Sequence, residues 1–165
     1  MPALAHLGIG FAIKRFTTLI PLWALLLSSM VLDILSFVLT LALWITHGLF
    51  MSVMWSAFAF LITIVITYWL KSRRQQNSNL ILWNKKILNI GVIIALVVFS
   101  HWILDFIGWP MSVINDYKGV PLLFDDAVYI GLGVYSTWFG ALLMDIGVFV
   151  IGLIIYIHYK LRIKK

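Results

Sequence analysis

The chain has 165 residues, of which 63% are hydrophobic and 11% charged, and its mean hydropathy is +1.06. A soluble globular domain is nearer half apolar and a quarter charged, so this composition excludes an ordinary cytosolic domain and indicates an integral membrane protein. Twelve basic residues against six aspartates, with no glutamate, give a net charge of +6. Most basic residues flank apolar segments, where they suit anionic headgroups, so we exclude nucleic acid as a partner. The chain has no cysteine, so only His and Asp could hold a metal ion.

The predicted elements begin with an apolar segment, residues 1–16, that is too short to cross a bilayer. It predicts either a helix lying on the inner surface or a half-helix that dips into the bilayer and carries His6 inward. Four longer segments then approach or exceed the ~20 residues that a spanning helix needs. They are Pro21 to about Trp44, Gly48–Leu70, Ile87–Ile107 and about Trp138 to Tyr159. An irregular segment from Gly131 to Thr137 is expected before the last one.

The sequence therefore predicts an all-α, polytopic membrane protein with about four transmembrane helices and a short N-terminal half-helix. All of it forms one domain, residues 1–165, because no linker or internal repeat divides the chain.

The distribution of basic residues predicts the orientation, because cytoplasmic loops retain Lys and Arg. If four helices alternate, Lys118 alone falls on one side, in an outward loop over residues 108–126. All the others fall on the opposite side: Lys14, Arg15, Lys71, Arg73, Arg74, Lys85, Lys86, Lys160, Arg162, Lys164 and Lys165. The pattern predicts a multi-pass protein of the inner (cytoplasmic) membrane with a cytoplasmic C-terminus.

Ionisable side chains inside the predicted spans are candidates for a functional site, because a charge at the bilayer centre costs at least ~2.5 kcal/mol. They are Asp33, His101, Asp105 and Asp145, and His47 lies at the expected outward turn. The helical rise places all five in the outer half of the membrane. His101 and Asp105 are spaced i, i+4 and therefore share a helix face. With no basic residue in the spans, the set favours a bound divalent cation, and the alternative is a structural cluster of hydrogen bonds.

Several short motifs follow one another in a characteristic order. They are His6-Leu7-Gly8-Ile9-Gly10 with Lys14-Arg15-Phe16, Leu32-Asp33, Thr46-His47 and Ser100-His101-Trp102-Ile103-Leu104-Asp105. In this order they resemble the bacterial membrane-bound metal-dependent hydrolase family that includes LexA-binding inner-membrane proteins. Two later segments, Val120-Pro121-Leu122-Leu123 and Gly131-Leu132-Gly133-Val134-Tyr135-Ser136, look like the loop of its permease-like branch. The resemblance covers most of the chain.

That family is similar in motif order to zinc-dependent phospholipase C and the P1-type nucleases, which are helical enzymes with clustered zinc ions. The resemblance implies that one divalent ion, zinc as in those enzymes, is held by Asp33, His47, His101 and Asp105. It implies that His6 holds a second ion with a bridging Asp105, that Asp145 matches the acid of a third site, and that Asp33 is also the catalytic base.

The chain departs from the family pattern at two places. Leu35 replaces a second aspartate, and Ala42-Leu43-Trp44 replaces a His-Arg-Gly motif. The spacing from Asp33 to His47 adds a geometric condition. In a straight helix these residues would be ~21 Å apart, so a shared ion requires a turn between them, although no Gly or Pro occurs from residue 34 to residue 47.

These observations predict a membrane-embedded metal-dependent hydrolase that acts on a phosphoester or lipid-like substrate from the outer half of the bilayer. Its expected partner is a membrane lipid or lipid-linked substrate, and a homo-oligomer is left open. The alternative is a small non-enzymatic membrane protein, a transport component or scaffold, in which Asp33, His101 and Asp105 form a buried polar cluster.

Overall fold

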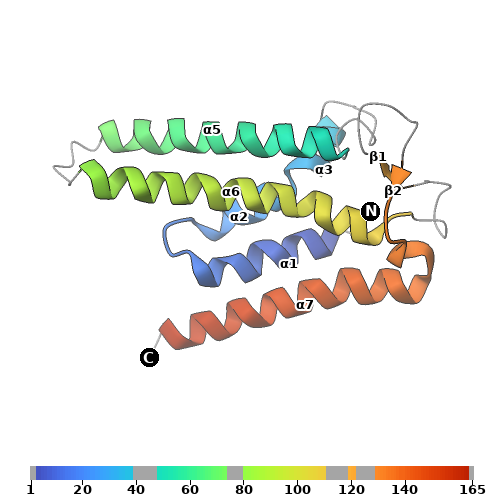
Figure 1. Cartoon of the computed structure of the whole chain (residues 1–165). Helices are drawn as coiled ribbons and strands as arrows, with labels where there is room; N and C mark the ends of the chain where they lie inside the picture. Colours follow the sequence, from blue (N-terminus) through green and yellow to red (C-terminus); the bar gives the residue numbers. More distant parts are fainter. Residues whose placement is uncertain (1–2, 39–47, 74–79, 111–118, 122–128, 164–165) are drawn as a thin grey trace.

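The computed structural model describes residues 3–38, 48–73, 80–110, 119–121 and 129–163, and shows a bundle of helices (Figure 1). The helices are α1 (Ala3–Ile13), α2 (Leu22–Ser29), α3 (Val31–Val38), α5 (Leu49–Arg73), α6 (Leu80–Gly108) and α7 (Trp138–Ile163). Two short 3-10 helices, η1 (Lys14–Phe16) and η2 (Val134–Ser136), and two short strands, β1 (Val120–Pro121) and β2 (Tyr129–Ile130), complete the described part. The predicted all-α class is confirmed, apart from the two-residue strands.

Three helices are long and apolar enough to cross a membrane: Leu49–Arg73, Asn84–Gly108 and Trp138–Ile163. They match three of the predicted spans, and α7 begins at Trp138 after an irregular segment, as expected. The fourth predicted span, from Pro21, differs from the expectation. Its described part consists of two helices of eight residues each, and its remainder lies outside the described residues, as does His47.

The break between α2 and α3 falls at Met30, whose backbone leaves helical geometry at φ −108° and ψ 2°. Two serines just before it explain the change. Ser28 donates its hydroxyl to the Ala24 carbonyl at 2.7 Å, and Ser29 donates to the Leu26 carbonyl at 2.8 Å. Such bonds to the preceding turn compete with backbone hydrogen bonds and bend helices, so the serine pair ends α2 without a glycine or proline.

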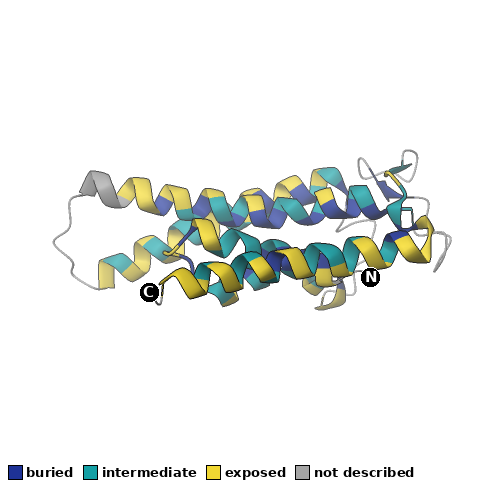
Figure 2. Ribbon diagram, turned by 90° about the horizontal axis from the view of Figure 1, so that it is seen from below, coloured by how far each residue is buried: buried dark blue, intermediate teal, exposed yellow. Residues whose placement is uncertain are grey.

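Helix α6 is the central element of the bundle. It packs against α5 along its length and also contacts α1, α2 and α3. In its most apolar 18-residue window 39% of the residues are buried, compared with 6% in α5 and in α7. Figure 2 shows exposed residues on the outward faces of the helices and buried ones between them. The exposed faces of α5 and α7 are rich in large apolar side chains, as expected of lipid-facing helices.

The N-terminal segment forms a helical hairpin, in which the chain leaves α1 through η1 and returns in α2 (Figure 1). Helix α1 packs mainly against α7, and the two helices approach to backbone contact at two glycines. A Cβ atom on Gly152 would overlap the Gly8 carbonyl oxygen. Small residues at such crossings allow close packing of helices in membranes. The short N-terminal helix that the sequence predicts is therefore present, and α7 holds it in place.

Basic residues gather at the end of the bundle where η1 lies and where α7 ends. The Lys14 ammonium donates to the Ile20 carbonyl at 2.6 Å, and burial, followed by the nearby charge of Lys160, lowers the pKa of Lys14. Figure 1 places the last turn of α5 and the first turn of α6 at this same end. Arg73 stacks there on Trp69, with 4.2 Å between the guanidinium carbon and the ring centroid.

The opposite end is closed by the connection from α6 to α7. Strands β1 and β2 pair antiparallel, with Val120 opposite Ile130. A small core of Trp109, Val120 and Tyr135 lies beside them. The Tyr135 ring occupies the space that a side chain at Gly108 would need, so the tyrosine is fixed against the end of α6.

Candidate metal centre

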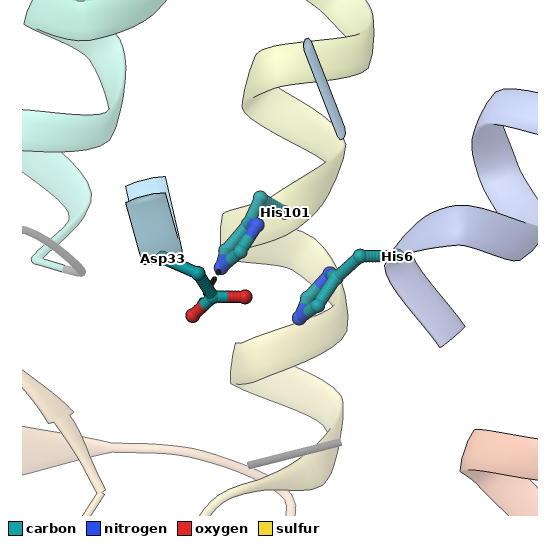
Figure 3. A group of neighbouring side chains, drawn as sticks. All are labelled: His6, Asp33 and His101. Atoms are coloured by element: carbon teal, nitrogen blue, oxygen red, sulfur yellow. Dashed lines mark ion pairs between the residues drawn. The ribbon is translucent and has the colours of Figure 1, made fainter. Parts of the chain in front are cut away.

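Three side chains from separate helices converge on one point inside the bundle. Figure 3 shows His6 from α1, Asp33 from α3 and His101 from α6 pointing toward one another. One nitrogen or oxygen atom of each lies within 4.8 Å of the others, so the group could hold a metal ion. Asp105 lies one turn after His101 on α6 and faces both histidines. Four of the residues predicted as ligands are therefore brought together.

The orientation of His101 is set by the break between α2 and α3. Its Nδ1 atom lies 2.8 Å from the Ser29 carbonyl oxygen. A carbonyl can only accept, so Nδ1 is the donor in this contact and Nε2 is the ring nitrogen that faces the rest of the group. Metal-binding histidines typically have this arrangement, with one ring nitrogen bonded to a carbonyl and the other presented to the ion.

The Nε2 atom of His101 faces two carboxylates. It lies 3.5 Å from Asp105 Oδ2 and 3.7 Å from Asp33 Oδ1. A nitrogen electron pair and two negative oxygens repel one another unless a cation or a proton lies between them. The charge pattern of the group therefore favours a bound positive species.

His6 faces Asp105, at the carboxylate oxygen that His101 does not face. Its Nε2 atom is 3.6 Å from Asp105 Oδ1, and its ring stacks parallel to that of His101 with 3.7 Å between centroids. Each oxygen of Asp105 thus faces the Nε2 atom of a different histidine. Asp105 therefore faces both histidines.

The N···O distances between these side chains can be compared with those of hydrogen bonds and of ligands that share a metal ion. An N–H···O hydrogen bond is ~2.7–3.2 Å long, which is shorter than all three distances in the group. Ligands placed ~2.0–2.2 Å from a tetrahedral zinc ion are separated from each other by ~3.3–3.6 Å. The observed 3.5–3.7 Å spacing fits an ion between the side chains better than direct hydrogen bonds.

The group is closed on most sides and more open at Asp33. The side chains of His6, His101 and Asp105 are at most 5% exposed, whereas the Asp33 side chain is 16% exposed. No basic residue occurs in α3, or in α6 after Lys86, which precedes His101 by ~22 Å of helix. Within these two helices, the basic residue nearest to the group is therefore about four turns of α6 away from His101.

Among the described residues, Asp145 is a predicted ligand that the structure does not place with His6, Asp33 and His101. It lies on α7 and accepts a hydrogen bond from the Ala5 backbone N–H at 2.7 Å. His47 lies outside the described residues, so the four-ligand set that includes it stays a prediction. His158 is exposed near the end of α7 and does not belong to the group.

Tyr135 is a neighbour of the site that the sequence did not single out. Its side chain is 1% exposed, and burial raises the pKa of its phenol, with the negative charges of Asp145 and Asp105 adding to the effect. The phenol consequently stays protonated and can only be a neutral donor or acceptor. Its segment, η2, lies in the motif over residues 131–136, but that resemblance gave the tyrosine no role, and hydropathy does not mark it because it precedes a predicted span.

The fold and site together define a helical protein with three candidate membrane spans and a buried His-Asp group that could hold a metal ion. In comparisons with known proteins, no family model, no curated protein and no solved structure matches this chain.

Proposed function

We propose that this protein is a membrane-embedded metal-dependent hydrolase that acts on a phosphoester or lipid-like substrate. The observation that carries the proposal is the position of Asp105, whose two oxygens face the Nε2 atoms of His6 and His101 at 3.6 and 3.5 Å. Asp33 completes the His101 side of the group. The resemblance of the Ser-His-x-x-x-Asp motif to membrane-bound metal-dependent hydrolases points to the same activity.

The donor set favours zinc as the bound metal. Imidazole nitrogens and carboxylate oxygens are ligands that zinc accepts readily, and they are the only ones this group offers. In this proposal Asp105 would be a ligand of two ions, with His6 as a further ligand of one and with His101 and Asp33 as further ligands of the other. A divalent ion would supply a Lewis acid that lowers the pKa of a bound water and polarises a phosphoryl oxygen.

Each residue of the group then has a separate task. His101 presents Nε2, because Ser29 fixes its tautomer and ring orientation. Asp33 is the most exposed member, so it is the carboxylate that an incoming substrate and water would reach, and we assign it the role of general base. The apolar surroundings of the site favour a substrate that is itself in the membrane, such as a phospholipid or a lipid-linked phosphate.

The proposed orientation of the protein in the membrane follows from the basic residues at the ends of the helices. Basic residues gather at the end of the bundle that contains η1 and the end of α7, which supports a multi-pass protein of the cytoplasmic membrane with a cytoplasmic C-terminus. The site then lies nearer the opposite side, where the substrate would be met.

The activity is tested with purified protein in phospholipid nanodiscs, loaded with zinc or manganese. We expect hydrolysis of bis(p-nitrophenyl) phosphate or of phosphatidylglycerol, and we expect Asp33→Asn to lower kcat by roughly 10²–10⁴-fold, because the general base is lost. His158→Ala is the control and should retain full activity, because this histidine is exposed and outside the site.

Equal rates for the native protein and Asp33→Asn would contradict the assignment of the base. No hydrolysis of any phosphoester or phospholipid by metal-loaded protein would contradict the hydrolase itself and leave the buried cluster as a structural or transport element.

A further inference from the structure

Helix α1 starts inside the protein, where its first backbone groups need partners. Ala5 is fully buried and His6 is 3% exposed. The first four N–H groups of any helix have no acceptor within the helix, and the apolar interior of a membrane supplies no water to replace it. The Ala5 N–H is one of these four, and it donates to Asp145 Oδ1 at 2.7 Å. This length is typical of a charge-assisted hydrogen bond.

A second contact between α1 and α7 lies further along both helices. Gly8 packs directly on the backbone of Val148 and Phe149, and Gly152 packs on Gly8. Asp145 and Gly152 are seven residues apart, so they lie on the same face of α7. The two helices run in the same direction (Figure 1), and α1 is thus attached to one face of α7 at two successive points.

These attachments determine where His6 points. His6 directly follows Ala5, and each residue of a helix is turned by ~100° from the previous one. When the Ala5 N–H is held by α7, the His6 ring is directed to α6, where its Nε2 atom meets Asp105. A small rotation or fraying of the first turn of α1 would move the ring away.

We propose that Asp145 is a positioning residue, which holds the first turn of α1 and thereby places His6 at the metal centre. This role differs from the ligand role that the family resemblance implies, and it rests on the proposed metal site.

Two nearly isosteric variants separate positioning from ligation. In Asp145→Asn the amide oxygen can still accept from Ala5, whereas in Asp145→Leu no acceptor remains. Hydrogen–deuterium exchange of the N-terminal peptide, in metal-free protein, should be roughly tenfold faster in Asp145→Leu because the Ala5 N–H loses its side-chain acceptor. Asp145→Asn should exchange at nearly the native rate.

Cobalt titration, followed by the visible absorption of the bound ion, reports the metal centre itself. We expect about tenfold weaker cobalt binding and a changed spectrum in Asp145→Leu, because His6 is displaced. Asp145→Asn should retain the native spectrum. The control is Ile146→Ala, whose side chain is 47% exposed on the outer face of α7 and should change neither measurement.

Two results would overturn the proposal. Unchanged exchange in Asp145→Leu would show that Asp145 does not hold α1. Native exchange in Asp145→Asn combined with a lost or altered cobalt spectrum would show that the carboxylate binds the ion. A native protein that binds no cobalt would refute the proposed metal site, and the exchange measurement would still decide whether Asp145 holds α1.

Discussion

Replacing Asp105 by alanine is expected to abolish the stabilisation of the protein by divalent metal ions. Each oxygen of this carboxylate faces one of the two histidines, so its loss removes a ligand from both sides of the group. Loss of a residue that only supports a ligand weakens metal binding by ~10–100-fold, and loss of a shared ligand should exceed that. When the free metal ion is present at about a hundred times its Kd, the native protein should gain about 2.7 kcal/mol of stability.

The effect is measured as the shift in thermal unfolding of detergent-solubilised protein when zinc or manganese is added. The native protein should show a rise in Tm with metal, and Asp105→Ala and His101→Ala should show none. His158→Ala is the matched histidine control and should keep the full rise, since it removes an exposed imidazole away from the site. An undiminished metal-dependent rise in Asp105→Ala would mean that the metal binds elsewhere.

Replacing Gly152 by alanine is expected to separate α1 from α7. The added methyl group would overlap the backbone carbonyl of Gly8, and neither backbone can move without shifting a whole helix. Overpacking of this kind costs about 1–3 kcal/mol, and the cost here should fall at the upper end because the obstacle is backbone. His6 lies on α1, so weaker metal binding should accompany the loss of stability.

Gly147→Ala is a matched control on the same helix. Apart from its chain neighbours and the nearby backbone of α7, no atom of the described residues lies within 4 Å of the position that its Cβ would take. This variant should be neutral, or more stable by up to about 1 kcal/mol, because alanine favours the helix over glycine. Thermal unfolding of the two variants side by side tests the contact. Equal stability of Gly152→Ala and Gly147→Ala would contradict the close packing of α1 on α7.

The long helices could be predicted because their signal is local. An uncharged apolar run of sufficient length predicts a spanning helix wherever it occurs, and α5, the apolar part of α6 and α7 follow that pattern closely. The site could be predicted in part for the same reason. His101 and Asp105 lie one turn apart, so helical geometry alone places them on one face.

The break at Met30 was not predicted, because the expectation of a helix break was tied to glycine and proline. The signal was present in Ser28 and Ser29, whose hydroxyls bond to the preceding turn. The break also releases the Ser29 carbonyl that orients His101, a contact across 72 residues. No local pattern shows such a contact.

The role of Asp145 was equally hidden, because it depends on a hydrogen bond across 140 residues to a backbone N–H. A sequence does not show which backbone N–H group needs a partner from a distant side chain. An aspartate in an apolar span therefore indicates that a partner exists, without indicating whether that partner is a metal ion or the end of another helix.

The most direct test of the account is the metal content of the protein purified without chelator and reconstituted with zinc. Elemental mass spectrometry of the native chain and of His101→Ala should be compared. The account predicts one or two equivalents of zinc per native chain, because Asp105 faces a histidine on each side, and a clear loss in His101→Ala. Zinc at background in the native protein, or an equal content in both proteins, would contradict the existence of a metal centre at this group.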